Sequence, residues 1–261
     1  MVTAKQPLFD RTLFKDRNFA TSLVFMAVTG VLLLGGLALL PPLLQNLYGY
    51  SVLQSGFLTA PRGLGTLFSM LIAGRLTGKM DARILVGAGV ILMGVSLHMM
   101  TKFAIEQPSS PVIVSGIVQG LGLGLIFVPL QTLAFETLAT RFRTTGAALL
   151  NLSRNIGGSI GISVVSTELV RITQISHADM AASITQNTLP ALNSTMMENL
   201  APYGNAALAF INAEITRQAL FIAYLDDFKL MMMVTFAVLP LLLFMKRGQR
   251  AGTGGPPVHM D

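Results

Sequence analysis

The chain has 261 residues, of which 52% are hydrophobic and only 11% are charged. A soluble domain carries about 25% charged residues, so this composition excludes an ordinary soluble protein and points to the lipid bilayer. The absence of cysteine also excludes a disulfide framework and thiolate metal sites.

Six apolar segments are long enough to cross the hydrocarbon core of a membrane, which takes about 20 residues each. They cover residues 19–41, 53–74, 84–104, 111–136, 145–168 and 225–245. We therefore predict an all-α membrane protein with six transmembrane helices. Such helices can be grouped as three plus three of opposite orientation, a 3+3 inverted repeat.

The chain divides around these helices. Residues 1–18 form a cytoplasmic lead-in with an interfacial helix, and residues 19–168 hold transmembrane helices one to five. Residues 169–224 are predicted as an external loop with an amphipathic helix, and 225–245 as the last transmembrane helix. The tail at 246–261 is predicted to be disordered and cytoplasmic, because glycine, proline and charge bury too little surface.

The basic residues predict the orientation in the membrane. An N-terminus in the cytoplasm places most of the 18 lysines and arginines in inside segments, as the positive-inside rule requires. These are Lys5, Arg11, Lys15, Arg17, Arg75, Lys79, Arg83, Arg141, Arg143, Lys246, Arg247 and Arg250. Both termini are therefore expected in the cytoplasm, with the chain in the inner membrane. The net charge of +6 is then a topology signal, and no nucleic-acid partner is expected.

One arginine lies inside the second helix, in the stretch FLTAPRGLGTLF. Arg62 follows Pro61, whose ring removes a backbone donor and leaves the carbonyl one turn earlier unpaired. Arginine at the centre of a membrane helix costs about 2.5–3.5 kcal/mol on insertion scales. Two interpretations stay open: a structural clamp on freed carbonyls, or a residue of a substrate cavity or gate.

The fifth helix carries a polar face. Asn151, Arg154 and Asn155 share one side of the helix, and Gly158 continues it. Such a face is costly against lipid, so it either bonds to a neighbouring helix or lines a cavity or gate.

The fourth helix carries Gly116, Gly120 and Gly124 at intervals of four. Small residues at this spacing predict close helix packing. The GLGLG sequence there lacks the preceding strand that a nucleotide-binding loop needs. Gln119, on the same helix, is a candidate cavity residue.

The ionisable residues do not predict catalysis. Glu136, Glu168, Asp226 and Asp227 all fall at the ends of the predicted helices, where water reaches them. His98 is then the one titratable group expected within the membrane, and the chain is expected to lack the main proton-binding site. No nucleophile–base pair or metal-ligand cluster is evident, so we expect neither an enzyme nor a cofactor.

Several stretches together resemble one family: LFKDRNF, APRGLGTLFSMLIAGRLTGKMDAR, LSRNIGGSIG and RQALFIAYLDDFKLMMMVTFAVLPLLLF. They are similar to the C-terminal half of the fourteen-helix drug:proton antiporters of the major facilitator superfamily, the EmrB/QacA group. This resemblance implies that the six helices form one half of a major facilitator fold. It also implies a cytoplasmic loop motif that biases the inward–outward equilibrium, here Gly74, Arg75, Gly78, Asp81 and Arg83.

The resemblance implies a multidrug efflux transporter that exports lipophilic compounds. The N-terminal half of that family, with its proton-carrying acid, has no counterpart in this sequence, so the chain is expected to be inactive without it. A periplasmic adaptor protein is a further implied partner, besides membrane lipid. The alternative is a truncated or accessory membrane protein that does not transport and docks on a complete transporter.

Overall fold

The computed structural model of the chain describes residues 12–136, 138–183 and 204–245. The described residues form helices joined by short links. In chain order these are α1 (Thr12–Lys15), α2 (Arg17–Asn46), α3 (Val52–Thr77), α4 (Ala82–Met100), α5 (Ser110–Glu136), the 3-10 helix η1 (Thr140–Phe142), α6 (Arg143–Ser183), α8 (Gly204–Ala237) and the 3-10 helix η4 (Leu239–Phe244).

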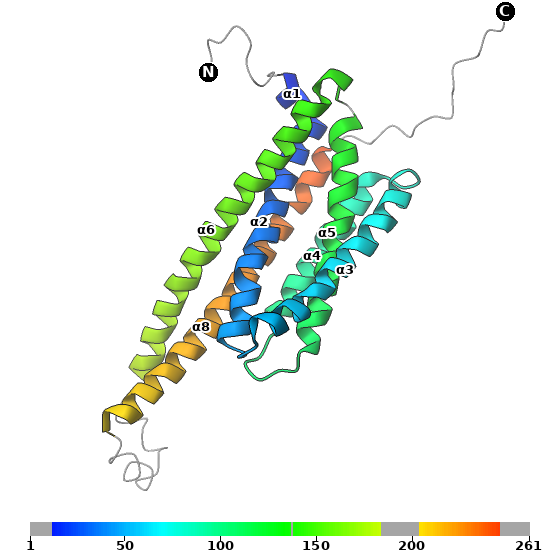
Figure 1. The fold of residues 1–261 in the computed structure, drawn as a ribbon. Helices are drawn as coiled ribbons and strands as arrows, with labels where there is room; N and C mark the ends of the chain where they lie inside the picture. The colour runs from blue at the N-terminus through cyan, green and yellow to red at the C-terminus, as the bar shows by residue number, and fades with distance from the viewer. Residues whose placement is uncertain (1–11, 137, 184–203, 246–261) are drawn as a thin grey trace, which may run out of the picture.

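The long helices run roughly along one direction, with α2 in the middle of the bundle (Figure 1). α2 contacts α3, α5, α6 and α8, while α3 packs mainly on α5 and α6 packs on α2 and α8. One end of the bundle, the α1 end, holds α1, the link from α3 to α4, η1 and η4. The opposite end holds the links from α2 to α3 and from α4 to α5, and α6 and α8 continue side by side beyond it (Figure 1).

Side-chain caps begin three of the long helices. The carboxylate of Asp16 accepts hydrogen bonds from the backbone nitrogens of Asn18 and Phe19, and so separates α1 from α2. Ser51 and Gln54 form a reciprocal capping box at the start of α3. Asp81 begins α4 by accepting from the backbone nitrogen of Arg83. The sequence therefore sets where these helices start, independently of their packing.

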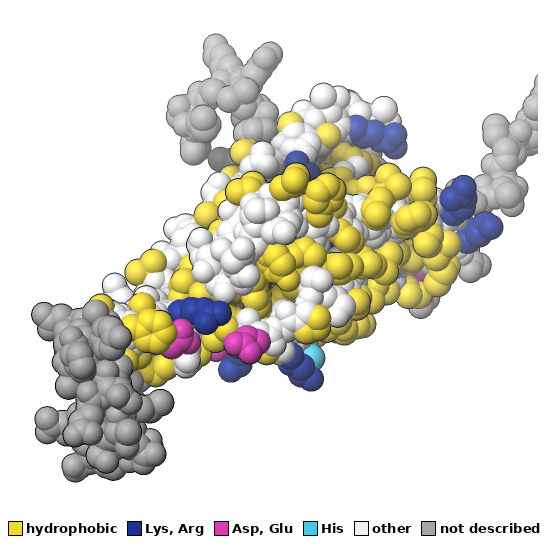
Figure 2. All heavy atoms as spheres, turned by 60° about the horizontal axis from the view of Figure 1, so that its bottom comes forward, with side chains coloured by type: hydrophobic (Ala, Val, Ile, Leu, Met, Phe, Trp, Pro, Cys, Tyr) yellow, Lys and Arg dark blue, Asp and Glu magenta, His cyan; other side chains and the backbone are white. Residues whose placement is uncertain are grey.

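Close contact between α2 and α6 depends on glycine. A Cβ atom on Gly30 would collide with the carbonyl oxygen of Arg154, and one on Gly157 would collide with the carbonyl oxygen of Ala27. Backbones that approach so closely are typical of membrane helices, where packing and not a hydrophobic drive brings helices together. Hydrophobic side chains cover much of the face drawn in Figure 2, and the charged ones lie mainly toward its margins.

Each predicted transmembrane segment falls on a helix, although 84–104 runs past the end of α4 and 225–245 runs past α8 into η4. Two helices also extend beyond the predicted membrane spans. The fifth predicted helix was expected to end at 168, whereas α6 continues to Ser183. The amphipathic stretch 206–223 was expected to be separate from the last helix, whereas both belong to the uninterrupted α8. The reason is that residues 169–183 contain no glycine or proline, so a fall in hydropathy changes the surroundings of the helix without ending it. The two extensions contact each other, with His177 Nε2 3.0 Å from Asn212 Oδ1.

Four of the helical segments in the described residues are long and apolar enough to span a membrane: α2, α4, α5 and Ala209–Phe244. α3 and α6 are long enough but are not among them, so a set of six spans stays a prediction. The predicted lead-in before residue 12 and the predicted tail at 246–261 lie outside the described residues.

Candidate functional site

A groove of about 550 Å³ lies between α2, α3 and α5. Its wall is mostly apolar, and the charged residue in it is Arg62. Leu33, Leu37 and Leu40 of α2 form one side, and Leu67 and Met70 of α3 are among the residues of the other. A mostly apolar hollow with one charged group is the arrangement typical of a small-molecule binding site.

Arg62 is almost completely buried, with 8% of its surface exposed. Its Nη2 atom has no hydrogen-bond partner among the described residues. Of the two interpretations of Arg62, the clamp on the carbonyl freed by Pro61 has no hydrogen bond to support it among the described residues. Because a buried guanidinium without an acceptor is costly, Arg62 has unused capacity to bind an acceptor that enters the groove.

Gln119 lies beside Arg62, although the two come from different helices. A methyl group placed on Gly36 of α2 would lie 3.5 Å from Arg62 Nη1 and 3.7 Å from Gln119 Nε2. Gln119 is 1% exposed, and neither its Nε2 nor its Oε1 has a partner among the described residues. The structure thus brings together two of the sequence-predicted residues, with two unused donors and one unused acceptor between them. We call Arg62 and Gln119 the polar pair.

Glycines on α5 allow α3 to pack closely against that helix. A Cβ atom on Gly120 would collide with the carbonyl oxygen of Arg62, and one on Gly124 would lie 2.6 Å from the Cβ of Ser69. A Cβ atom on Gly116 would meet Arg62 only at an ordinary contact distance of 3.8 Å. The hydroxyl of Ser69 also donates to the carbonyl oxygen of Leu121 across this contact. The position of Arg62 over the groove therefore depends on this packing.

The predicted residues of α6 lie apart from the polar pair. Asn151 and Asn155 are exposed, and Asn151 donates to the carbonyl oxygen of Ala147 in its own helix. The guanidinium of Arg154 lies 5.6 Å from the centre of the Phe127 ring on α5, a cation–π contact. Gly158 is buried, and a Cβ atom there would collide with Leu34 of α2.

The predicted loop motif surrounds the link from α3 to α4. Gly74 and Arg75 lie in the last turn of α3, and Gly78 follows as its C-cap. Asp81 caps α4, and the Nε atom of Arg83 has no hydrogen-bond partner among the described residues.

Three of the four acidic residues expected at helix ends lie inside helices instead: Glu168 in α6, and Asp226 and Asp227 in α8. Asp227 was expected at a helix end within reach of water, but it lies inside α8 with 0% of its surface exposed. The error arose because we placed the start of the last helix at 225, and α8 begins 21 residues earlier, at Gly204. His98, expected to be the titratable group within the membrane, is exposed in the last turn of α4. In the described part of the chain, no cluster of three His, Asp or Glu residues is arranged to hold a metal ion.

Comparison with known proteins finds relatives that are named for export or resistance. The chain is 29% identical to the multidrug export protein EmrB of Escherichia coli (strain K12), over 99% of this chain and 51% of that protein. It is also 29% identical to the fatty acid resistance protein FarB of Neisseria gonorrhoeae, over 96% of this chain and 50% of that protein. The chain thus spans about half the length of these relatives.

The fold of this chain also resembles that of a transporter of known structure. A crystal structure of a bacterial homologue of the human lysosomal transporter Spinster, in an inward-facing conformation, matches 88% of this chain and 50% of that chain. Its TM-score is 0.57 and the sequence identity is 17%, so this likeness concerns the fold. The family model of the Major Facilitator Superfamily matches residues 3–162, which is more than half of the chain. The chain therefore belongs to the Major Facilitator Superfamily, a family of transporters and not of enzymes.

Proposed function

We propose that this chain is the C-terminal half of a proton-coupled multidrug efflux transporter, which exports lipophilic compounds and needs an N-terminal half to do so. The observation that carries the proposal is a polar stripe on α6. Asn151, Asn155, Ser159, Ser163 and Thr167 follow one another at intervals of four, and all five are exposed. Neighbouring members of this series lie about one turn apart and close together, and the stripe winds gradually around the helix.

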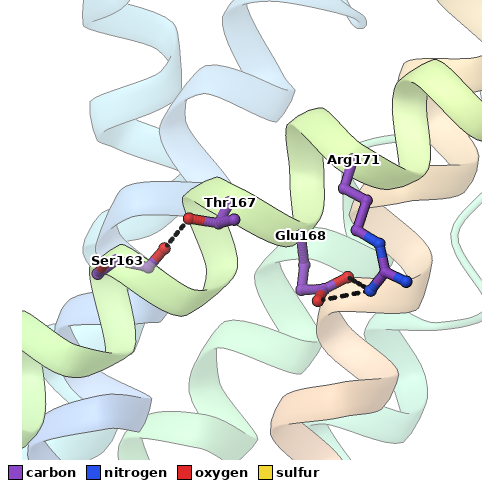
Figure 3. Close-up of polar contacts among 4 residues, drawn as sticks. All are labelled: Ser163, Thr167, Glu168 and Arg171. Atoms are coloured by element: carbon purple, nitrogen blue, oxygen red, sulfur yellow. Dashed lines mark hydrogen bonds and ion pairs between the residues drawn. The ribbon is translucent and has the colours of Figure 1, made fainter.

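The polar stripe favours a protein surface or a water-filled cavity beside α6. Asn151, Ser159 and Thr167 donate to carbonyl oxygens of their own helix, as Thr167 does to the carbonyl oxygen of Ser163 at 2.8 Å (Figure 3). These bonds reduce the cost of polar atoms in a membrane, but the remaining donors and acceptors still disfavour contact with lipid. Because the relatives are about twice as long, a second half of the transporter is the partner that fits this face.

The division into halves also accounts for the two helices that are not apolar enough for a membrane span by themselves. α3 and α6 both present one side that this chain leaves uncovered, as at Leu64 and Leu67 of α3 and Ile156 and Ile160 of α6. A helix shielded from lipid by protein does not need a fully apolar surface. Six membrane-spanning helices, arranged as a 3+3 inverted repeat, are thus compatible with the four segments that qualify by hydropathy.

The orientation is proposed from the distribution of charge. Arg17, Arg75, Lys79, Arg83 and Arg143 are all close to the α1 end of the bundle. The positive-inside rule then places this end in the cytoplasm, and both termini with it. The paired extensions of α6 and α8 would project on the external side, where they offer a surface for a periplasmic adaptor.

The polar pair is proposed as the part of the site that meets the polar end of a lipophilic substrate. The groove supplies apolar walls, while Arg62 supplies a charge and Gln119 supplies both a donor and an acceptor. A carboxylate on a long apolar body fits these groups, and FarB, one of the relatives, is named for fatty acid resistance. The predicted loop motif, Arg154 and the α6 stripe are then proposed to control the conformational change.

The test is efflux from cells that lack their own pumps. The chain is expressed alone, with a separately encoded N-terminal half from a relative, and as a fusion to that half, and accumulation of a fluorescent lipophilic compound is measured. We expect reduced accumulation only when both halves are present. Accumulation equal to that of empty-vector cells in every case, with both halves detected in the membrane, would falsify the transport proposal. It would favour the alternative of an accessory protein that docks on a complete transporter, for which co-purification is the readout.

A further inference from the structure

Asp227 is the buried acid for which the proposed function has so far given no role. It lies in the apolar segment Ala209–Phe244, none of its surface is exposed, and neither carboxylate oxygen has a hydrogen-bond partner among the described residues. An ionised carboxylate without donors or a cation is unfavourable in such surroundings. The site therefore suits a ligand that cancels the charge.

The groups around Asp227 supply no such cation. Phe228 follows it in the sequence, Tyr224 and Met231 lie about one turn away on α8, and all three are buried. Glu168 of α6 and Asp226 are the carboxylates whose charges act on it, and both repel a second negative charge.

The other helices that pack on α8 are α2, α4 and the 3-10 helix η4, and η4 has no charged residue. α2 carries no charged residue after Arg17, and α4 carries Arg83 in its first turn and the exposed His98 in its last. None of these offers an ion-pair partner to Asp227 in the described part of the chain.

The position of Asp227 along the bundle is set by two aromatic contacts. The ring of Phe228 lies 6.2 Å from that of Phe103, in the link after α4. About two turns earlier on α8, the ring of Phe221 lies 6.5 Å from the ring of Tyr48, in the link after α2. Both links are at the end of the bundle opposite to α1. Asp227 is therefore buried close to the side that we propose to be external.

An ion pair on α6 lies at the solvent-exposed side of this helix. Glu168 is partly exposed, and one of its oxygens lies 3.2 Å from Nη1 of Arg171, whose side chain is 66% exposed (Figure 3). This ion pair keeps a carboxylate at the boundary between α8 and the solvent. A small separation of α6 and α8 would connect Asp227 with water through it.

We propose that Asp227 is a proton-binding site of the transport cycle, which this half contributes itself. On the external side the carboxylate takes up a proton, which forms an O–H bond and discharges the side chain. The neutral acid is then stable in its buried position between α8 and α6. Release of the proton restores the carboxylate and requires that water or a donor reach it again. This proposal rests on the proposed transport function for its role in the cycle, but the proton-binding site itself does not depend on transport.

The site is tested by infrared difference spectroscopy of the full chain in lipid bilayers. The carbonyl stretch of a protonated carboxylic acid is recorded across a pH titration for the wild type, Asp227→Asn and Asp226→Asn. Asp226 is the matched control, because it is the adjacent acid on the same helix but is only half-buried. We expect a protonated-acid band in the wild type and in Asp226→Asn, and its loss in Asp227→Asn. An unchanged band in Asp227→Asn would overturn the proposal.

Folding is controlled by size-exclusion chromatography of each variant. Should Asp227→Asn aggregate, Asp227→Glu serves instead, and we expect it to keep the band at a shifted frequency and titration midpoint. A Glu variant that leaves both unchanged would also overturn the assignment.

Coupling is tested with the two halves together in vesicles. We expect Asp227→Asn to abolish accumulation driven by a pH gradient while exchange of substrate without a gradient continues, and Asp226→Asn to behave as the wild type. Gradient-driven transport that persists in Asp227→Asn would remove Asp227 from the cycle. Absence of transport by the wild type, with the infrared band present, would instead count against the proposed function and leave the proton-binding site intact.

Discussion

The carbonyl oxygen of Arg62 on α3 lies directly over Gly120 on α5, so close that a Cβ atom on Gly120 would collide with it. This contact fixes the part of α3 that carries the buried guanidinium. It therefore couples the packing of two helices to the position of the charged group in the groove.

Substitution of Gly120 by alanine should separate α3 from α5. We expect a loss of stability of about 1–3 kcal/mol, the usual range for overpacking, because the obstacle is backbone and cannot turn aside. Gly116→Ala is the matched control one turn earlier, where a Cβ atom would have an ordinary contact of 3.8 Å with Arg62. Thermal unfolding of the two variants in detergent measures the difference. Equal melting temperatures would contradict the close approach of α3 and α5.

Replacement of Arg62 by methionine should separate stability from binding. Methionine fills similar space without a charge, so we expect the chain to become more stable. The gain is limited by the cost of an arginine in a membrane helix, about 2.5–3.5 kcal/mol. Binding of a lipophilic carboxylate, measured by fluorescence quenching of a labelled fatty acid, should be lost. Arg75→Met at the exposed end of α3 is the control. It should change both the stability and the binding of the fatty acid much less than Arg62→Met does. A strongly destabilised Arg62→Met would mean that Arg62 has an acceptor we have not identified.

The uncovered face of α6 should become protected when the N-terminal half is present. The chain has no cysteine, so single cysteines can be introduced without a background. We expect Ile160→Cys, at a residue 56% exposed, to react with a membrane-permeant maleimide in the chain alone and to be protected in the complete transporter. Ile91→Cys on α4 is equally accessible at 50% exposure and should react to the same extent in both. Protection of both positions, or of neither, would contradict the assignment of α6 to the interface between the halves.

Tyr48 should give the chain a stability that depends on alkaline pH. Burial, with a smaller effect from Tyr50, raises the pKa of Tyr48 from 10 to about 12. Because the folded protein holds this proton more tightly than the unfolded chain, the stabilisation is complete below pH 10 and is lost as the pH rises through about 12. Ultraviolet titration of tyrosinate, combined with unfolding in urea at each pH, measures the effect.

The control for Tyr48 is phenylalanine. The hydroxyl of Tyr48 donates a 2.7 Å hydrogen bond to the carbonyl oxygen of Ala104, which ties the link after α2 to the link after α4. Tyr48→Phe should cost about 0.5–1.5 kcal/mol at neutral pH and should remove the loss of stability between pH 10 and 12. A loss that persists in Tyr48→Phe would assign it to another tyrosine.

The sequence predicted the helices better than their ends. Apolar segments of sufficient length located every long helix, because a backbone in lipid has to satisfy its own hydrogen bonds. The extension of α6 to Ser183 was missed, since hydropathy reports where a helix meets lipid and not where it stops. The same limitation placed Asp227 at a helix end and so concealed a buried carboxylate.

The sequence also selected Arg62 and Gln119, but for separate reasons and without a connection between them. A charge in an apolar segment is visible in the sequence because its cost in lipid is large. Their convergence on Gly36, more than 25 residues from Arg62 and more than 80 from Gln119 along the chain, depends on three helices packing at once. Asn151 and Asn155 look equally polar in the sequence, yet they lie on an uncovered face and not in the groove.

By itself, the sequence determined that this protein is a helical membrane protein of the Major Facilitator Superfamily, since composition, helix length and local motifs are properties of neighbouring residues. Only the tertiary structure decided which polar groups are buried without partners. Burial is a property of the packed bundle: Arg62, Gln119 and Asp227 lose water because other helices cover them, and no local pattern records which helices those are.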